Sequence, residues 1–224
     1  MMHSKDFQLG EIIHNLMLKN NLESAVNYDV IQKWQDDEKI ETITHKFSEF
    51  IKELGMDLNN NSIKDTPRRV VRFYLNELFY GLDYRNFPKI SFDDNIYNYN
   101  SPLISSGIKV TSTCEHHFVS INGQAVVGYI PKNRIVGLSK INRVVDFFAK
   151  RPQVQERMTK QLYVALKYIL DTDDVAVAIN AKHNCIVIRG VKDSNTRNIT
   201  FELGGKFSED QVLKDNFYQQ ILIE

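Results

Sequence analysis

One short segment, TSTCEHHF, brings a cysteine, a glutamate and two histidines into four consecutive positions. The whole chain holds only 2 cysteines and 6 histidines, so this clustering is notable. Thiolate sulfur and imidazole nitrogen are the usual ligands of Zn²⁺ in proteins, which makes Cys114 and His117 candidate metal ligands. Taken alone, a buried cysteine is more often a small hydrophobic residue, and chance clustering in a half-buried strand is the ordinary alternative.

The second cysteine lies in another polar cluster, AKHNCIVIRG, which has the composition of a strand. Alternate residues of a strand share one face, so His183, Cys185 and Arg189 are expected to point the same way. Cys114 and His117 are three apart, so both can reach one ion only if their own strand bends or bulges. Three protein ligands with one position left for water is the arrangement of a catalytic zinc site.

Basic side chains suited to an anion follow these segments. Ser139 is placed to cap a helix formed by SKINRVVDFF, and Lys140 and Arg143 share one face of it. A helix N-terminus with a hydroxyl and two cations suits phosphate, although a solvated charged face is the commoner explanation of such a group.

Two more groups could serve the same anion. Arg69 and Arg72 are three apart in TPRRVVR, and Arg189 would lie roughly 13 Å from Cys185 along an extended strand. That spacing fits a ligand with one end at a metal and a polyphosphate at the other. Glu156 lies near a helix start, where a carboxylate is electrostatically favoured. It could equally recognise a base edge with adjacent N–H donors, as guanine has, and the residues leave both explanations open.

The composition limits the possible functions. With 224 residues, 42% hydrophobic and 25% charged, the chain can bury a sizeable core. A formal net charge of zero argues against a general nucleic-acid binder. No apolar run approaches the roughly 20 residues that span a bilayer, and the N-terminus lacks a secretory pattern. We therefore expect a cytoplasmic protein without membrane or nucleic-acid partners, whose cysteines are free thiols or ligands.

The spacing of apolar residues, which indicates the helices and strands that position these side chains, changes from helical in the first half of the chain to a mixture of strands and helices in the second. Residues 1–100 are expected to form an N-terminal helical region, in which Thr66 is the N-cap and Pro67 the first residue of a helix. Residues 101–224 are expected to form the catalytic domain. There, Asn122-Gly123 is the strongest local signal for a hairpin turn, and two helices separated at Arg151-Pro152 are followed by further strands. This order predicts an α+β fold, an antiparallel sheet with helices on one face.

Several of these segments together closely resemble GTP cyclohydrolase I, over about residues 66–207. They are TPRRV, SGIKVTSTCEHHFVSINGQAVVGYIPK, GLSKINRVVDFFAKRPQVQERMTKQ, HNCIVIRG and ELGG. The resemblance implies a tunnelling fold, in which a four-stranded antiparallel sheet carries two helices on one face, and a homodecamer of two pentamers with active sites between subunits. It implies hydrolytic opening of the guanine imidazole ring of GTP, loss of formate and closure to 7,8-dihydroneopterin triphosphate, the first step of folate or biopterin synthesis.

The resemblance also implies roles for individual residues. Zn²⁺ would be held by Cys114, His117 and Cys185, and a zinc-activated water would attack carbon 8 of guanine. His116 and His183 would transfer protons. The substrate-binding residues would be Glu156 with Gln155 at the guanine edge, Ser139, Lys140, Arg143 and Arg189 at the ribose and triphosphate, and Arg69 and Arg72 from a neighbouring subunit.

Two departures and two alternatives accompany this resemblance. Ile186 stands where methionine or valine is common, and Arg72 where a lysine is frequent; neither removes a needed chemical group. One alternative is another tunnelling-fold enzyme acting on a pterin or deazapurine. The other is a zinc-stabilised nucleotide-binding protein without turnover.

Overall fold

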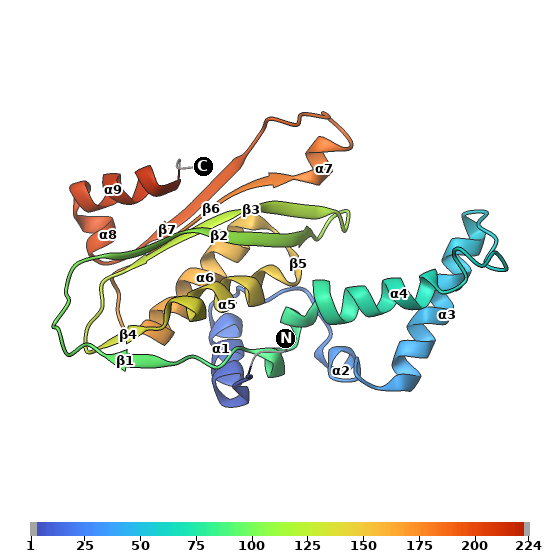
Figure 1. The fold of residues 1–224 in the computed structure, drawn as a ribbon, viewed down its shortest axis with the longest axis horizontal. Helices are drawn as coiled ribbons and strands as arrows, with labels where there is room; N and C mark the ends of the chain where they lie inside the picture. The colour runs from blue at the N-terminus through green and yellow to red at the C-terminus, as the bar shows by residue number, and fades with distance from the viewer. Residues whose placement is uncertain (1–3, 222–224) are drawn as a thin grey trace.

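The computed structural model describes residues 4–221 and is built on a five-stranded sheet of order β5-β2-β3-β6-β7 (Figure 1). Its long strands pair antiparallel, and only the two-residue strand β5 lies parallel to β2. The strands are β2 (Leu103–Cys114), β3 (Ser120–Tyr129), β5 (Pro152–Gln153), β6 (Val175–His183) and β7 (Asn198–Leu203).

Helices cover both faces of this sheet. On one face lie α5 (Leu138–Ala149) and α6 (Gln155–Leu170), whose apolar residues at helical spacing form the main core with β2, β3 and β6. On the other face, Phe207 of α8 (Lys206–Glu209) and Phe217 of α9 (Gln211–Ile221) pack on Val126 and Ala178. The α+β class is confirmed. The sequence predicted four strands with helices on one face, and so missed both β5 and the second helical layer. This second layer forms because alternate residues of β3 and β6 are apolar on the face that α8 and α9 cover.

The hairpin between β2 and β3 does not turn where the sequence predicted. Asn122 and Gly123 lie inside β3, where Gly123 pairs with Val110 on one side and Ala181 on the other. A side chain at Gly123 would bring its Cβ to 2.1 Å from the carbonyl oxygen of Asn180. The glycine is therefore needed for close strand packing, and the turn falls on residues 115–119 instead.

The described residues up to 100 are mostly helical, and some of their apolar side chains belong to the main core with those of the sheet and of α5 and α6. Their helices are α1 (Phe7–Lys19), α2 (Tyr28–Ile31), α3 (Asp37–Glu53), α4 (Thr66–Phe73), η1 (Tyr74–Leu78), η2 (Tyr80–Leu82) and η3 (Tyr84–Asn86). The helices α3 and α4 project from the body (Figure 1). Asp65 occupies the N-cap position of α4 rather than Thr66, while Pro67 lies in the first turn as predicted. Strand β1 (Phe92–Asp94) pairs with β4 (Arg134–Val136), on either side of residue 100.

A buried ionic group joins the N-terminal region to the link between α5 and α6. The side chain of Arg151 is wholly buried and lies 3.6 Å from Glu23. Its guanidinium packs over the rings of Tyr84, Phe147 and Phe148, and the hydroxyl of Tyr84 donates to Glu23 at 2.7 Å. This arrangement satisfies a charge that would otherwise be costly to bury. None of the described helices is long and apolar enough to cross a membrane.

Candidate metal centre and active site

The turn after β2 carries the CEHH segment. The amide of Cys114 donates to the carbonyl of Val119 at 2.8 Å, and the amide of Phe118 donates back to Cys114 at 2.9 Å. Phe118 adopts a left-handed backbone with φ of 53°, and its ring packs on Phe79 at 5.6 Å. The strand thus ends at Cys114 and bends back, which confirms the distortion that two ligands three residues apart require.

The second cysteine lies on a helical turn and not on a strand. β6 ends at His183, and α7 (Asn184–Val187) follows directly. The expected alternation of Cys185 and Arg189 along an extended strand is therefore wrong, as is the spacing inferred from it. The physical reason is the sheet itself: His183 pairs with Ile121 at the start of β3, so no partner strand continues beyond it. Asn184 fixes the turn by donating to the hydroxyl of Ser120 at 2.6 Å.

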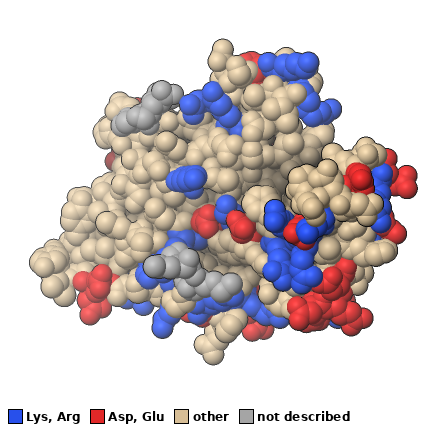
Figure 2. Space-filling model, turned by 45° about the vertical axis from the view of Figure 1, so that its right-hand side comes forward, with Lys and Arg blue, Asp and Glu red and all other residues tan. Residues whose placement is uncertain are grey.

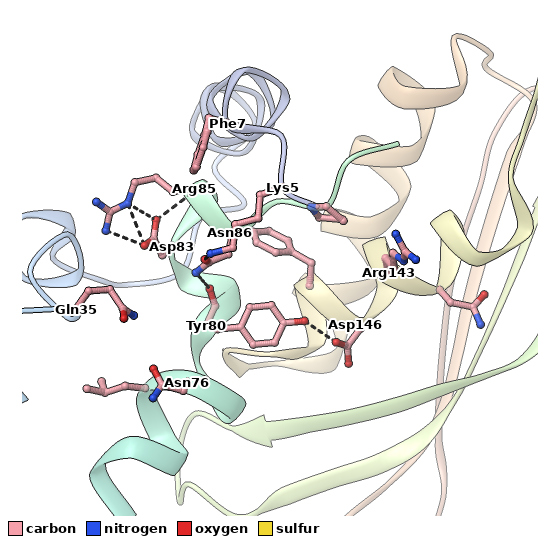
Figure 3. Close-up of a pocket in the computed structure, with 14 residues that line it drawn as sticks. Lys5, Phe7, Gln35, Asn76, Tyr80, Asp83, Arg85, Asn86, Arg143 and Asp146 are labelled. Carbon is pink, nitrogen blue, oxygen red and sulfur yellow. Dashed lines mark hydrogen bonds and ion pairs between the residues drawn. The ribbon is translucent and has the colours of Figure 1, made fainter. Parts of the chain in front are cut away.

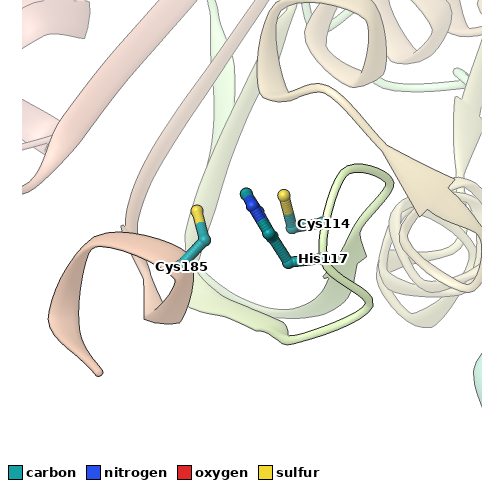
Figure 4. A group of neighbouring side chains, drawn as sticks. All are labelled: Cys114, His117 and Cys185. Atoms are coloured by element: carbon teal, nitrogen blue, oxygen red, sulfur yellow. The ribbon is translucent and has the colours of Figure 1, made fainter. Parts of the chain in front are cut away.

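Cys114, His117 and Cys185 nevertheless meet, with ligand atoms all within 4.8 Å of one another (Figure 4). Figure 4 shows the three side chains converging from the β2 turn and from α7. Burial, together with a hydrogen bond with the neighbouring Cys114, raises the pKa of the Cys185 thiol, because burial disfavours the charged thiolate. Two thiols and one imidazole are a donor set that fits Zn²⁺.

Two other predicted residues border this cluster. The Nδ1 atom of His116 lies 3.7 Å from the sulfur of Cys114. The guanidinium of Arg189 contacts Nε2 of His117. Both His116 and Arg189 are exposed, so solvent reaches the cluster's edge at these two side chains.

His183, at the end of β6, is half-buried. Its Nε2 atom lies 2.7 Å from the side-chain oxygen of Gln155. Burial lowers the pKa of His183, and the negative charge of Glu156 opposes that shift. Glu156 is exposed in the first turn of α6, so its carboxylate is open to solvent and close enough to act on the charge of this histidine.

An ion pair that the sequence analysis missed holds the CEHH turn against α6. Arg157 donates to the carboxylate of Glu115 at 2.5 Å, to the side-chain oxygen of Gln153 at 3.2 Å and to the carbonyl of Pro152 at 3.2 Å. Glu115 lies between two candidate site residues, Cys114 and His116, and this position in the sequence was a reason to consider it. Its partner could be found only from the parallel pairing of β2 with β5.

The other predicted anion-binding residues lie on α4 and α5, and not on the two segments that carry the cluster. Ser139 does not cap α5: Gly137 holds that position, and Ser139 lies exposed in the first turn. Arg143 lines a cavity of about 830 Å³ beside Lys5, Tyr80 and Asp146 (Figure 3). The cavity is bounded by residues of the N-terminal region and α5, and none of the three clustered ligands lines it.

The arginines of α4 lie on the projecting helices. Arg69 and Arg72 are both exposed, and Arg69 lies 3.8 Å from Asp65 on its own helix. Figure 2 shows basic and acidic side chains interspersed over the face it presents, in keeping with the zero net charge. Any polyphosphate site must therefore be built from a few local cations.

Comparison with known proteins gives one consistent result. The family model described as GTP cyclohydrolase I matches residues 43–222. The GTP cyclohydrolase 1 of Wigglesworthia glossinidia brevipalpis is 49% identical over 80% of this chain and 85% of its own length. Those of Erwinia tasmaniensis and Vibrio vulnificus strain YJ016 are 42% and 45% identical; they cover 96% and 93% of this chain, and 96% and 94% of their own lengths.

A solved structure also matches more distantly. The apo archaeosine synthase QueF-Like is 15% identical and superposes with a TM-score of 0.39 over 48% of this chain and 94% of its own, too weak a likeness to define the fold. The family model and the relatives identify the chain as a hydrolytic enzyme rather than a binding module. It belongs to the GTP cyclohydrolase I family.

Proposed function

We propose that this enzyme opens the imidazole ring of GTP with Zn²⁺ held by Cys114, His117 and Cys185, releases formate and forms 7,8-dihydroneopterin triphosphate. The observation that carries the proposal is the convergence of two thiols and an imidazole to within 4.8 Å. A zinc ion bound there would supply Lewis acidity and lower the pKa of a water molecule. The product would enter folate or biopterin synthesis.

The chain's own residues would handle the protons and the guanine. His116, beside the sulfur of Cys114, and His183, beside Glu156, are the proposed proton-transfer groups at the ring nitrogens and the ribose oxygen. Glu156 has an exposed carboxylate that can accept two hydrogen bonds from adjacent N–H donors of guanine. A carboxylate in this role selects guanine over adenine, because adenine does not present that pair of donors.

The triphosphate would be bound by Ser139, Lys140, Arg143 and Arg189. Arg69 and Arg72 lie on the projecting α4, a position suited to reaching the site of an adjacent subunit. This arrangement supports a ring assembly, proposed here as a homodecamer of two pentamers with the tunnelling fold. Mass measurement in solution tests the assembly; a stable monomer with full activity would contradict it.

A fluorescence assay tests the reaction. After oxidation and dephosphorylation, turnover of GTP should yield neopterin, whereas ATP should yield no pterin. The His183→Ala variant is expected to keep its zinc and lose turnover, which separates metal binding from proton transfer. Absence of a pterin signal from zinc-loaded wild-type protein would favour a nucleotide-binding protein without turnover.

A further inference from the structure

The side-chain amide of Gln155 is buried, with 2% of the residue exposed, and both of its ends are engaged. Its oxygen lies 2.7 Å from Nε2 of His183. Its nitrogen lies 3.0 Å from the carbonyl of Ile179, 2.9 Å from that of Asn198 and 3.0 Å from the hydroxyl of Thr200. The resemblance placed Gln155 beside Glu156 at the guanine edge, and in this chain both ends of its side chain bond to protein groups.

The chemistry of these partners fixes which way the amide points. Two of the three groups at one end are backbone carbonyls, which can only accept hydrogen bonds. The amide nitrogen must therefore face Ile179 and Asn198, since the opposite orientation would set an oxygen against two carbonyl oxygens. The amide oxygen is left facing His183.

The neighbouring hydroxyl groups agree with this orientation. Thr159 donates its hydroxyl proton to the carbonyl of Gln155 at 2.9 Å. The bond of 2.7 Å between the hydroxyls of Thr159 and Thr200 must then use the proton of Thr200. The oxygen of Thr200 can therefore accept a hydrogen bond from the Gln155 amide. The three hydrogen bonds then form a ring in which Gln155 donates to Thr200, Thr200 to Thr159, and Thr159 to the backbone carbonyl of Gln155.

We propose that Gln155 is a positioning residue that keeps a proton on Nε2 of His183, so that His183 exchanges protons with the substrate through Nδ1. An amide oxygen can only accept, so the imidazole nitrogen facing it must carry hydrogen in both the neutral and the charged ring. This inference rests on the proposed role of His183 in proton transfer. It assigns the guanine edge to Glu156 and removes the Gln155 side chain from substrate contact.

The first test needs only the wild-type protein. Nitrogen-15 NMR of zinc-loaded protein with labelled histidines reports which ring nitrogen carries hydrogen, and the signal missing from the His183→Ala spectrum identifies His183. At a pH where the ring is neutral, we expect the tautomer with hydrogen on Nε2. A spectrum showing hydrogen on Nδ1 would overturn the proposal whether or not the protein turns over GTP, so this result is independent of the proposed activity.

The second test separates positioning from substrate binding. Gln155→Met keeps the length of the side chain and removes the acceptor. We expect mixed tautomers of His183 and a fall in kcat of roughly tenfold or more, with the KM for GTP unchanged. An unchanged tautomer with a raised KM would show that the side chain binds guanine and would refute the positioning role.

A matched control comes from the same helix. Gln161 is also buried, and its side chain bonds to Gln153 at 2.7 Å and to the carbonyl of Leu22 at 2.6 Å. Gln161→Met removes comparable hydrogen bonds away from His183, so it should alter stability while leaving the His183 tautomer as in wild type. If the His183 tautomer also changes in Gln161→Met, the NMR signal responds to destabilisation of the protein in general. The result from Gln155→Met would then not support a positioning role for Gln155.

Discussion

Arg157 and Glu115 join the first turn of α6 to the turn that carries the candidate metal ligands, through a hydrogen bond of 2.5 Å. Glu115 lies directly after Cys114, and Arg157 directly follows Glu156. The ion pair therefore couples the position of the proposed guanine-recognition carboxylate to that of the metal cluster. Both side chains are partly exposed, so the pair is expected to matter for geometry more than for global stability.

Removing this ion pair should weaken metal binding. Arg157→Met deletes the bonds to Glu115, Gln153 and Pro152. Partners that hydrogen-bond to metal ligands typically contribute about 10–100-fold to metal affinity. Because Arg157 orients the residue next to a candidate ligand, we expect a fall towards the lower end of that range in competition with a chelator. Lys160→Met, which removes an exposed pair with Glu202 on the same helix, is the control and should retain wild-type affinity. Equal affinities in all three proteins would show that the pair does not orient the site.

Removing a candidate ligand should have a larger effect on the metal. Cys185→Ser replaces one of the three converging donors, and zinc affinity should fall by more than the roughly 100-fold upper range for an orienting partner. Elemental analysis of purified protein and the neopterin assay measure the two consequences together. His116→Ala, next to a ligand in the sequence, should retain zinc; full zinc occupancy in Cys185→Ser would remove Cys185 from the ligand set.

Removing the buried arginine should destabilise the fold. Arg151→Met leaves Glu23 without its nearby cation, which lies 3.6 Å away in the native protein. Breaking a buried pair from one side costs about 3–5 kcal/mol, to be read from urea unfolding at fixed protein concentration. Arg85→Met, which breaks the surface pair with Asp83, should cost about 1 kcal/mol or less. Similar losses in both variants would contradict a special role for the buried pair.

His14 should make stability depend on pH. Its ring stacks on Tyr84 at 4.6 Å and lies 3.9 Å from Glu23. Burial lowers the pKa of His14, Glu23 opposes that shift and Arg151 adds to it. The unfolded chain therefore binds the proton more readily, so this contribution is present above the unfolded pKa of about 6.5 and is lost as the pH falls towards the folded pKa.

The measurement is the urea midpoint at about pH 7 and about pH 5, compared between variants. His14→Gln should show a smaller loss on acidification than wild type. His45→Gln changes a side chain that is 73% exposed and should follow the wild-type profile. A wild-type slope in His14→Gln would mean that other groups cause the acid sensitivity.

Local sequence patterns predicted the features that depend on neighbouring residues alone. The apolar spacing of α5 and α6 was sufficient to predict both helices, because each buries one stripe. The thiols and the imidazole were candidate ligands by residue type, and the structure brings their donor atoms to within 4.8 Å of one another. The bend after Cys114 followed from the requirement that ligands three apart reach one ion.

The errors occur where distant pairing overrides local preference. The Asn122-Gly123 pair favours a turn, but pairing with β2 and β6 on both sides keeps it extended. The β-branched run after Cys185 favours a strand, but the pairing of β6 with β3 ends at His183 and Ile121, one residue from the start of β3. Nor could the partners of Glu115 and Gln155 be predicted locally, because Arg157 and His183 are distant from them in the sequence.

The three converging donors come from segments that are separated along the chain by β3, α5, α6 and β6. An ion shared among them would close a long loop, and loop closure restricts the unfolded ensemble far more than the folded one. Zinc would then serve as a removable cross-link between the end of β2 and the segment beyond β6, so extracting it should lower the melting temperature together with the turnover of GTP.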